Sequence, residues 1–314
     1  MDLRMLGRSG LKVSPFCLGG NVFGWTIDEK RSIELLNAFV GAGFNFIDTA
    51  DVYSTWIPEH QGGESEAIIG TWMKSRRNRA SVVIATKVGM EMRGQRGLSK
   101  AHILASVEGS LRRLETDYID LYQSHKADPE TPIKETLAAY AELIAAGKVR
   151  AIGASNYTTA QLRTALEASA RLELPRYESL QPEYNLYTRA SYEQELEPLC
   201  REHGLGVIPY SALASGFLTG KYRSEKDFGK SPRGAGMKRY LDARGPRVLA
   251  ALDKIATKVG TTPAQVALAW LIARPSITAP IVSATSLAQL DEIMGAKRLK
   301  LDADAIERLN EASG

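Results

Sequence analysis

Short apolar segments rich in β-branched residues recur along the chain, and each is followed by a longer stretch with helical periodicity. The predicted strands are residues 16–18, 45–48, 82–87, 119–124, 151–155, 179–181, 206–210 and 278–282. The predicted helices are residues 28–42, 64–75, 100–114, 132–146, 158–171, 192–203, 246–259 and 263–273. Eight such units favour an α/β fold with a closed parallel (β/α)₈ barrel, or TIM barrel, over an open sheet.

The chain length agrees with this architecture. A barrel of this kind takes about 250 residues, the chain has 314, and no Pro/Gly/Ser-rich linker divides it, so we expect a single domain over residues 1–314. The opening RMLGRSGLKVS predicts a β-hairpin with a Ser-Gly turn that plugs one end of the barrel. We also expect a long loop after strand seven and an extra C-terminal helix over residues 302–311.

Residues with special turn and capping properties fall at the predicted helix ends. Ser99 and Thr131 precede helices as N-caps do, and Gly43, Gly147 and Gly204 follow helices at the position where a left-handed residue ends them.

Composition excludes several classes of protein. The formal net charge is +4, too small for a nucleic-acid-binding protein. The two cysteines, Cys17 and Cys200, form no CxxC pair, which argues against a disulfide framework or a thiolate metal site. The start has no apolar signal-peptide core, and no run of about 18 apolar residues occurs, so we expect a cytoplasmic protein without a membrane partner.

Polar or aromatic residues follow one predicted strand after another. In such barrels, functional residues lie at the carboxyl ends of the strands and in the loops that follow. The residues at this level are Asp48, Tyr53, Lys87, His125, Ser155, Asn156, Gln181 and Tyr210. Any one of them could mark only the return of polar sequence after a strand, but their recurrence favours a site.

Several segments carry a family resemblance. The stretches GFNFIDTADVYS, VVIATKVG, DYIDLYQSH, IGASNY, LQPEYNL and GVIPYSALASGFLTGKY resemble the signature segments of the aldo-keto reductases. The resemblance extends from GRSGLKVSPFCLGG to ATSLAQL, and its long loops are most similar to the bacterial and potassium-channel β-subunit branches. It implies a (β/α)₈ barrel that reduces aldehydes or ketones to alcohols with NADPH.

The resemblance also implies a catalytic set of Asp48, Tyr53, Lys87 and His125. Hydride transfer to a carbonyl carbon leaves negative charge on the oxygen, so a proton donor is needed there, and Tyr53 is expected to be that donor. The Lys87 ammonium is expected to lower the pKa of the phenol, and Asp48 to keep Lys87 charged. His125 is expected to bind and orient the carbonyl oxygen.

No GxGxxG motif opens a strand–helix unit, so a Rossmann domain is not predicted. The resemblance instead places the nicotinamide carboxamide on Ser155, Asn156 and Gln181, and the ring on Tyr210. The residues it implies for the pyrophosphate are Ser211, Leu213, Ser215, Gly216 and Lys221. Those it implies for the adenosine half, at a helix capped by Ser286, are Ser283, Thr285, Gln289 and Glu292.

Cofactor preference depends on the segment 221–247, which carries nine Lys or Arg against three acids. It is expected to be a lid over a polyanionic cofactor, with a simple solvated loop as the alternative. Gln289 and Ile293 stand where many family members have an arginine and an asparagine, and Ala212 where proline is frequent. We expect NADPH, with the basic segment supplying the missing cation, and NADH as the other possibility.

The substrate is predicted only as a small carbonyl compound. Trp25 and Trp56 lie near predicted strand ends and could wall an apolar substrate pocket. Structural packing is the alternative, and the same two possibilities apply to Phe23. Three other functions stay open: an aldolase with a Schiff base on Lys87, an NADPH-holding interaction module with little turnover, and a metal-dependent hydrolase. The histidines lack metal-ligand spacing, so no metal is predicted. The sequence leaves the oligomeric state open.

Overall fold

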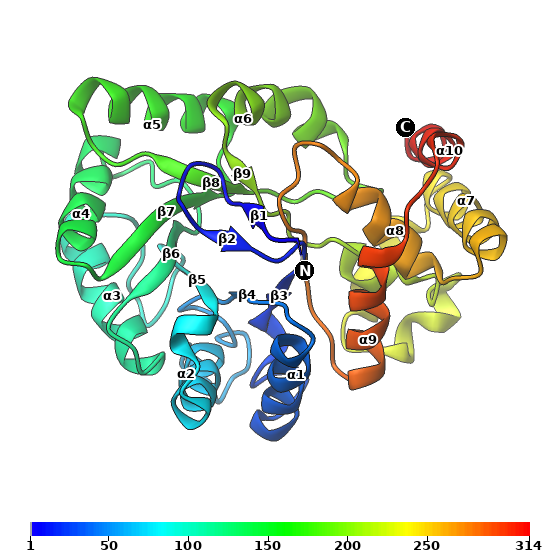
Figure 1. Cartoon of the computed structure of the whole chain (residues 1–314), viewed down its shortest axis with the longest axis horizontal. Helices are drawn as coiled ribbons and strands as arrows, with labels where there is room; N and C mark the ends of the chain where they lie inside the picture. The colour runs from blue at the N-terminus through cyan, green and yellow to red at the C-terminus, as the bar shows by residue number, and fades with distance from the viewer. Residues whose placement is uncertain (1) are drawn as a thin grey trace.

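The centre of the molecule is an eight-stranded parallel sheet curled into a barrel, seen in a computed structural model that describes residues 2–314 (Figure 1). The strands are β3 (Cys17–Gly19), β4 (Phe46–Asp48), β5 (Val83–Val88), β6 (Ile119–Ser124), β7 (Val149–Ser155), β8 (Tyr177–Gln181), β9 (Gly206–Val207) and β10 (Ile281–Val282). Each strand from β3 to β8 pairs with the next in the chain, and β10 pairs with β3. Between β9 and β10, backbone bonds from Thr278 N to Val207 O and from Ile281 N to Pro209 O, each 2.8 Å, close the ring. The predicted barrel is confirmed.

The last two strands are shorter than predicted. Residues 206–210 and 278–282 give strands of only two residues each. Pro209 and Pro280 lie inside these segments and have no N–H to donate to a ladder. Tyr210 still forms an isolated bridge to Glu183, so it keeps its place at the end of the barrel wall.

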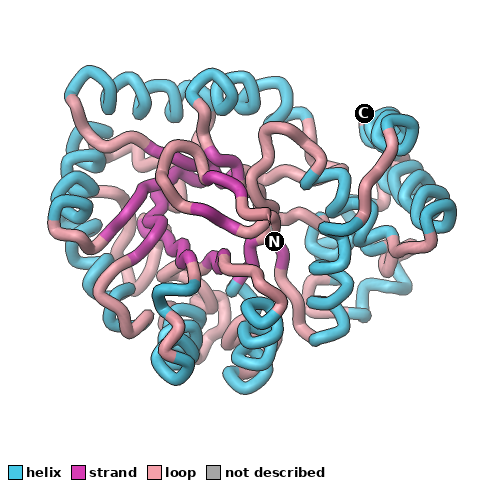
Figure 2. Tube along the Cα trace, viewed as in Figure 1, coloured by secondary structure: helices cyan, strands magenta, loops and turns pink. Residues whose placement is uncertain are grey.

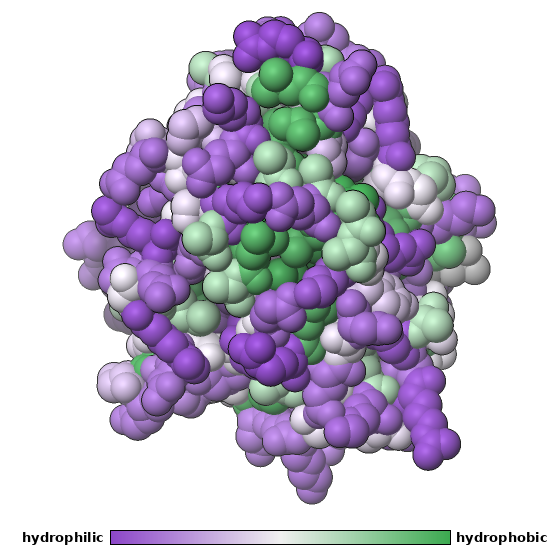
Figure 3. Space-filling model, turned by 90° about the vertical axis from the view of Figure 1, so that its left-hand side faces the viewer, coloured by the Kyte–Doolittle hydropathy of each residue, from purple (hydrophilic) through white to green (hydrophobic). Residues whose placement is uncertain are grey.

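Helices surround the barrel (Figure 2). They are α1 (Glu29–Gly41), α2 (Glu64–Arg76), α3 (Lys100–Arg113), α4 (Ile133–Ala145), α5 (Thr159–Leu172), α6 (Glu197–His203), α7 (Arg244–Val259), α8 (Pro263–Ile272), α9 (Leu287–Gly295) and α10 (Ala303–Ser313). On the face that carries α4, hydrophilic side chains cover most of the surface and apolar ones show in smaller areas between them (Figure 3). The helices thus turn their apolar sides to the barrel.

Most predicted helix ends are confirmed. Ser99 and Ser286 accept N-cap bonds from backbone N–H groups, and Gly43, Gly147 and Gly204 have positive φ. The prediction of Thr131 as an N-cap is wrong by one residue, because α4 starts at Ile133 and Pro132 occupies the cap. The helix predicted over 192–203 begins as a π-helix, Ser191–Leu196, before α6.

The barrel interior changes from apolar to polar along its axis. Phe46, Ala85 and Leu121 belong to one buried apolar cluster inside the barrel. Two residues further along the same strands stand Asp48, Lys87 and Gln123, all buried. Because side chains two apart on a strand share a face, these three also point inward. The polar set therefore lies on an apolar floor at the carboxyl end of the strands.

The N-terminal hairpin, β1 (Arg4–Met5) and β2 (Lys12–Val13), seals the other end. In Figure 1 it lies across the barrel opening that faces the viewer. Leu6, Leu11 and Val13 join the interior apolar cluster. Gly7 has φ +57°, and a Cβ there would lie 2.2 Å from the Glu178 carbonyl oxygen and 2.9 Å from Gly206 N. The plug can dock this closely only with glycine at position 7.

Replacing Gly7 by Ala should destabilise the protein by roughly 2–4 kcal/mol. The alanine would be strained by the left-handed backbone conformation and by the clash of its Cβ with β8. Gly10→Ala is the matched control, since Gly10 also has positive φ but a Cβ there meets nothing within 4 Å. It should cost about 1 kcal/mol. Urea unfolding of both variants measures the difference, and equal losses would contradict the close-docking argument.

Candidate active site

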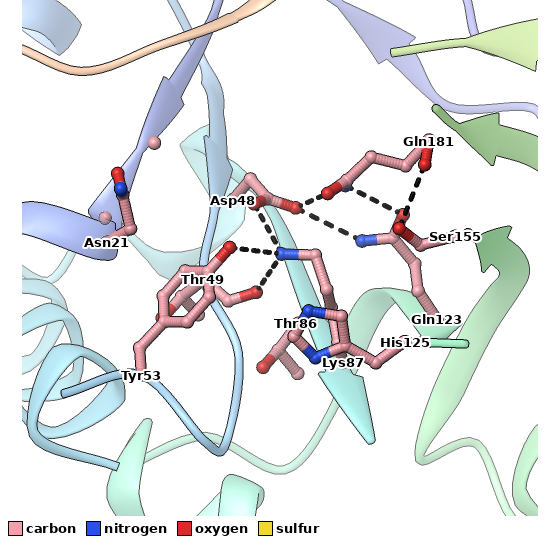
Figure 4. A network of polar contacts seen from close by, with 12 residues as sticks. Asn21, Asp48, Thr49, Tyr53, Thr86, Lys87, Gln123, His125, Ser155 and Gln181 are labelled. Atoms are coloured by element: carbon pink, nitrogen blue, oxygen red, sulfur yellow. Dashed lines mark hydrogen bonds and ion pairs between the residues drawn. The ribbon is translucent and has the colours of Figure 1, made fainter. Parts of the chain in front are cut away.

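A buried ammonium organises the polar end of the barrel. Lys87 Nζ donates to Asp48 Oδ2 at 2.6 Å, to the Thr49 carbonyl oxygen at 2.7 Å and to the Tyr53 hydroxyl at 2.9 Å (Figure 4). Lys87 is 0% exposed. Lys87 is the second-last residue of β5 and Asp48 ends the neighbouring β4, while Thr49 and Tyr53 lie in the loop that follows β4. All three ammonium protons therefore have acceptors.

These contacts keep Lys87 charged. Burial acts to lower the pKa of Lys87, but the Asp48 carboxylate and the Tyr53 oxygen outweigh burial, so the pKa rises above its ordinary value. The Asp48–Lys87 charge pair expected from the sequence thus has the geometry that keeps an amine protonated without water.

The Tyr53 phenol is held in its neutral form. Burial raises its pKa above the ordinary value, and Lys87 acts in the opposite direction without outweighing burial. The expectation that Lys87 brings this pKa below its ordinary value is therefore wrong, because dehydration and the Asp48 charge act against the ammonium. A proton stays on the phenol oxygen across the physiological range.

His125 lies beside the phenol, with ring centroids 6.2 Å apart. Burial, helped by the charge of Lys87, lowers the pKa of His125 to about 3. Its Nδ1 is buried without a hydrogen-bond partner in the described chain. The imidazole is therefore neutral, with ring-nitrogen capacity left for a ligand.

A second polar cluster lies at the ends of β7 and β8. Ser155 Oγ donates to the Gln181 carbonyl oxygen at 2.9 Å, and Asn156 Nδ2 to the His125 carbonyl oxygen at 2.9 Å. The Tyr210 hydroxyl donates to Asn156 Oδ1 at 2.8 Å. Asn156 has φ +55°, a conformation that asparagine tolerates well. These bonds hold Asn156 against the end of the barrel.

Both clusters border one cavity of about 780 Å³. Asp48, Tyr53 and His125 line it, whereas Lys87 is enclosed behind them. Every residue predicted to hold the cofactor also lines it: Ser155, Asn156, Gln181, Tyr210, Ser211, Leu213, Ser215, Gly216, Lys221, Ser283, Thr285, Gln289 and Glu292. The structure thus brings together residues that are more than two hundred positions apart in the chain.

The loop after β9 gives this cavity a wall suited to an anion. Ser211, Ala214, Ser215 and Gly216 all have positive φ, between 49° and 98°. Runs of such residues turn successive backbone N–H groups to one side and form anion-binding concavities. Gly216 has φ +98°, a backbone conformation that favours glycine.

The basic segment 221–247 is folded against the same cavity. It contains 3₁₀ turns at Glu225–Lys230 and Gly234–Tyr240, and Arg223 anchors it through two bonds to Asp253 of α7, at 2.7 and 2.8 Å. Lys221, Lys230 and Arg233 line the cavity. Arg233 Nη2 is buried without a partner in the described residues, which leaves a guanidinium nitrogen for an anionic ligand.

Trp25 and Trp56 do not line this cavity. Their rings pack edge to face at 5.3 Å, and Trp56 lies 6.0 Å from the Tyr53 ring. Trp56 is 45% exposed, and the Arg233 guanidinium lies 5.4 Å from the Trp25 ring. The pair forms an aromatic rim beside Tyr53, while Phe23 is fully buried in the core.

Two residues of the site were missed from the sequence. Asn21 lines the cavity just beyond β3 and accepts a 2.6 Å bond from Ser283 Oγ. The strand-end rule, applied to β3, would have found it. Gln123 lies within β6, where a buried amide in an apolar strand was the available signal.

Two other barrel chemistries lack support. A Schiff base needs an accessible amine, and Lys87 is enclosed with three acceptors. In residues 2–314, no group of three or more His, Cys, Asp or Glu side chains is placed to hold a metal ion. None of the helices described in that range has the length and apolar character needed to span a membrane.

Comparison with known proteins gives the family. Residues 15–313 match the model of the Aldo/keto reductase family. The chain is 36% identical to an uncharacterized oxidoreductase of Bacillus subtilis, YrpG, over 99% of this chain and 95% of that protein. It is also 35% identical to the aldo-keto reductase YhdN of the same organism, over 93% of this chain and 88% of that protein. A probable voltage-gated potassium channel subunit beta of Oryza sativa is 36% identical over 94% and 91% of the two chains. With its barrel and its family-wide match, the chain belongs to the aldo/keto reductase family of oxidoreductases.

Proposed function

We propose that this protein reduces aldehydes or ketones to alcohols with NADPH and that Tyr53 is the proton donor. The observation that carries the proposal is the bond between the Tyr53 hydroxyl and the buried Lys87 ammonium at the floor of the cavity. That bond places a neutral acid next to a fixed positive charge, as protonation of a developing alkoxide requires.

The cavity fits a nicotinamide dinucleotide at both of its ends. Ser155, Asn156 and Gln181 offer hydroxyl and amide groups that suit a carboxamide, and Tyr210 offers a ring face for stacking. The left-handed backbone at Ser215 and Gly216 and the cations of the basic segment suit phosphates. When bound, the dinucleotide supplies the hydride.

The chain's own residues handle the proton. Tyr53 carries it on the phenol oxygen and gives it to the carbonyl oxygen as negative charge develops there. Lys87 remains charged and stabilises the phenolate that forms, while Asp48 keeps Lys87 in place. The neutral imidazole of His125 orients the carbonyl oxygen with a hydrogen bond. The aromatic rim of Trp25 and Trp56 favours carbonyl compounds with an apolar part.

NADPH is favoured over NADH because cations reach the cavity. Gln289, at the start of α9, already bonds Thr285 through its Oε1, at 2.9 Å to the backbone N and 3.0 Å to Oγ1. Its neutral Nε2 group can donate hydrogen bonds to a phosphate but brings no positive charge. Lys221, Lys230 and Arg233 supply the positive charge instead.

A second candidate is a cofactor-holding module with slow turnover. The similarity to a probable potassium channel subunit beta supports considering it. A turnover assay with NADPH and a panel of aldehydes separates the two functions, because only the reductase consumes NADPH with each carbonyl.

Replacing Tyr53 by Phe should lower kcat for aldehyde reduction by about 10²-fold or more, because the proton donor is lost. Affinity for NADPH should change little, since the ring remains. Tyr118→Phe is the control, because Tyr118 directly precedes β6, at the amino ends of the strands and away from the site at their carboxyl ends. Steady-state kinetics and a binding titration test this prediction, and full turnover in Tyr53→Phe would exclude the proton-donor role.

Reduction should be almost independent of pH from about pH 5 to 9. His125, with a pKa of about 3, is already neutral at the acid end, and Tyr53, with a raised pKa, is still protonated at the alkaline end. Activity should fall only when the phenol ionises at higher pH. The measurement is kcat/KM against pH, and a limb between pH 6 and 8 assigned to Tyr53 or His125 would contradict these ionisation states.

Removing the cavity cations should separate the two cofactors. Lys221→Ala with Arg233→Ala should weaken NADPH binding by about tenfold or more, the effect of losing charge-assisted bonds, and NADH binding less. Lys226→Ala, on the exposed side of the same segment, is the matched control. Titration at two salt concentrations measures the effect. Equal affinities in all variants would leave the segment as a solvated basic loop.

A further inference from the structure

We propose that Gln123 is a positioning residue of this site: it fixes one oxygen of the Asp48 carboxylate and holds the Gln181 amide with its oxygen toward the cavity. The inference rests on the nicotinamide binding proposed above. Gln123 links two groups of residues: the proton-donor cluster around Lys87, and the residues proposed to bind the nicotinamide carboxamide.

Three buried side chains form a closed triangle of hydrogen bonds. Gln123 Nε2 lies 3.2 Å from Asp48 Oδ1, and Gln181 Nε2 lies 2.9 Å from the same oxygen. Gln181 Nε2 also lies 3.1 Å from Gln123 Oε1. Figure 4 shows both amides reaching the carboxylate oxygen that Lys87 does not bond. All three side chains are at most 2% exposed.

The chemistry of the carboxylate fixes how both amides are turned. A charged Asp48 can only accept hydrogen bonds, so each amide must present its NH₂ group to it. Gln123 Oε1 then accepts the second N–H of Gln181. Both Gln181 protons are used, and the remaining polar atom, Oε1, is the one available to the cavity that Gln181 lines.

The barrel leaves room for Gln123 in particular. Gly153 of β7 is its register partner, and a Cβ at Gly153 would lie 3.1 Å from Gln123 Cγ and 2.3 Å from Ser179 Oγ. Gly153 does not have positive φ. Glycine is therefore required at this position because a larger side chain has no space, and not because of the backbone conformation. Two residues earlier on the same strand, Leu121 belongs to the apolar floor. An amide buried above that floor is costly unless it is bonded, and its bonds go to Asp48 and Gln181.

The orientation matters for the ligand. A nicotinamide carboxamide has an NH₂ donor, and Gln181 Oε1 is an acceptor that suits it. Without Gln123, the Gln181 amide loses one of its two bonds and can turn its nitrogen to the cavity. Asp48 also loses one of the donors that hold the oxygen not used by Lys87.

The test compares binding of NADP⁺ with binding of its 3-acetylpyridine analogue, in which a methyl group replaces the carboxamide NH₂. Wild-type protein should bind NADP⁺ about 3- to 10-fold more tightly than the analogue, the range of one hydrogen bond. In Gln123→Leu this ratio should fall toward one. Isothermal titration gives the ratio without turnover, and thermal unfolding verifies that each variant is folded.

Ser179→Ala is the matched control. Ser179 lies in the same interior region, its Oγ is buried without a hydrogen-bond partner in the described residues, and it takes no part in the triangle. It should keep the wild-type ratio. A wild-type ratio in Gln123→Leu as well would overturn the orienting role alone. Failure of the wild-type protein to bind either dinucleotide would overturn the proposed function, and this inference with it.

Gln123→Glu gives a second test by pH. The ionisable groups nearest position 123 are Asp48, which Gln123 bonds, and Lys87, its register partner on β5, and Lys87 in turn bonds Tyr53 of the loop after β4. A protonated Glu can still donate to Asp48, whereas an ionised one places like charges side by side, which raises its pKa. The binding ratio should be near wild type at acidic pH and fall as pH rises. A ratio that does not change with pH in this variant would contradict the role.

Discussion

The site depends on one ammonium held without water among three oxygen atoms. Dehydrating Lys87 is unfavourable by itself, and the Asp48 carboxylate at 2.6 Å offsets that penalty. A pair of this kind is fragile in one specific sense: deleting one partner leaves a buried charge and typically costs about 3–5 kcal/mol. The positions of Asp48 and Lys87 are therefore constrained by stability as well as by the proposed chemistry. Tyr53 is hydrogen-bonded to an ammonium that two other acceptors hold in place.

Barrel closure is what allows this arrangement. β4 and β8 are separated by three strands in the sheet, yet Gln181 of β8 bonds Asp48 of β4 at 2.9 Å. The contact crosses the interior, which is possible because the sheet curves round on itself. The apolar layer below, plugged by the N-terminal hairpin, keeps water from entering from the other end. Fold and site thus depend on the same inward-facing positions.

The sequence predicted the fold and the place of the site because both follow from local periodicity. Strand ends with Asp48, Lys87 and His125 could be identified without coordinates. Gln123 could not, because its role depends on which side chains face it across the barrel. The pKa of Tyr53 was also out of reach, since its direction results from a balance between burial and two opposite charges. Trp25 and Trp56 were candidates for the pocket wall, but neither lines the cavity, because they pack against each other and Trp25 also contacts Arg233.

Burial sets the protonation states of Tyr53 and His125. The same dehydration that raises the pKa of Tyr53 lowers that of His125, so the phenol and the imidazole are both neutral, while Asp48 lines the cavity beside them and Lys87 is enclosed behind them. In the proposed reduction, a substrate oxygen that gains negative charge meets the phenol proton and the nearby Lys87 cation, with no competing charge on the imidazole. In the proposed reaction the phenolate left behind forms 2.9 Å from the Lys87 ammonium, while the positive charge left by hydride transfer stays on the nicotinamide. A site with this resting state is prepared to give up a proton, which is the requirement of carbonyl reduction.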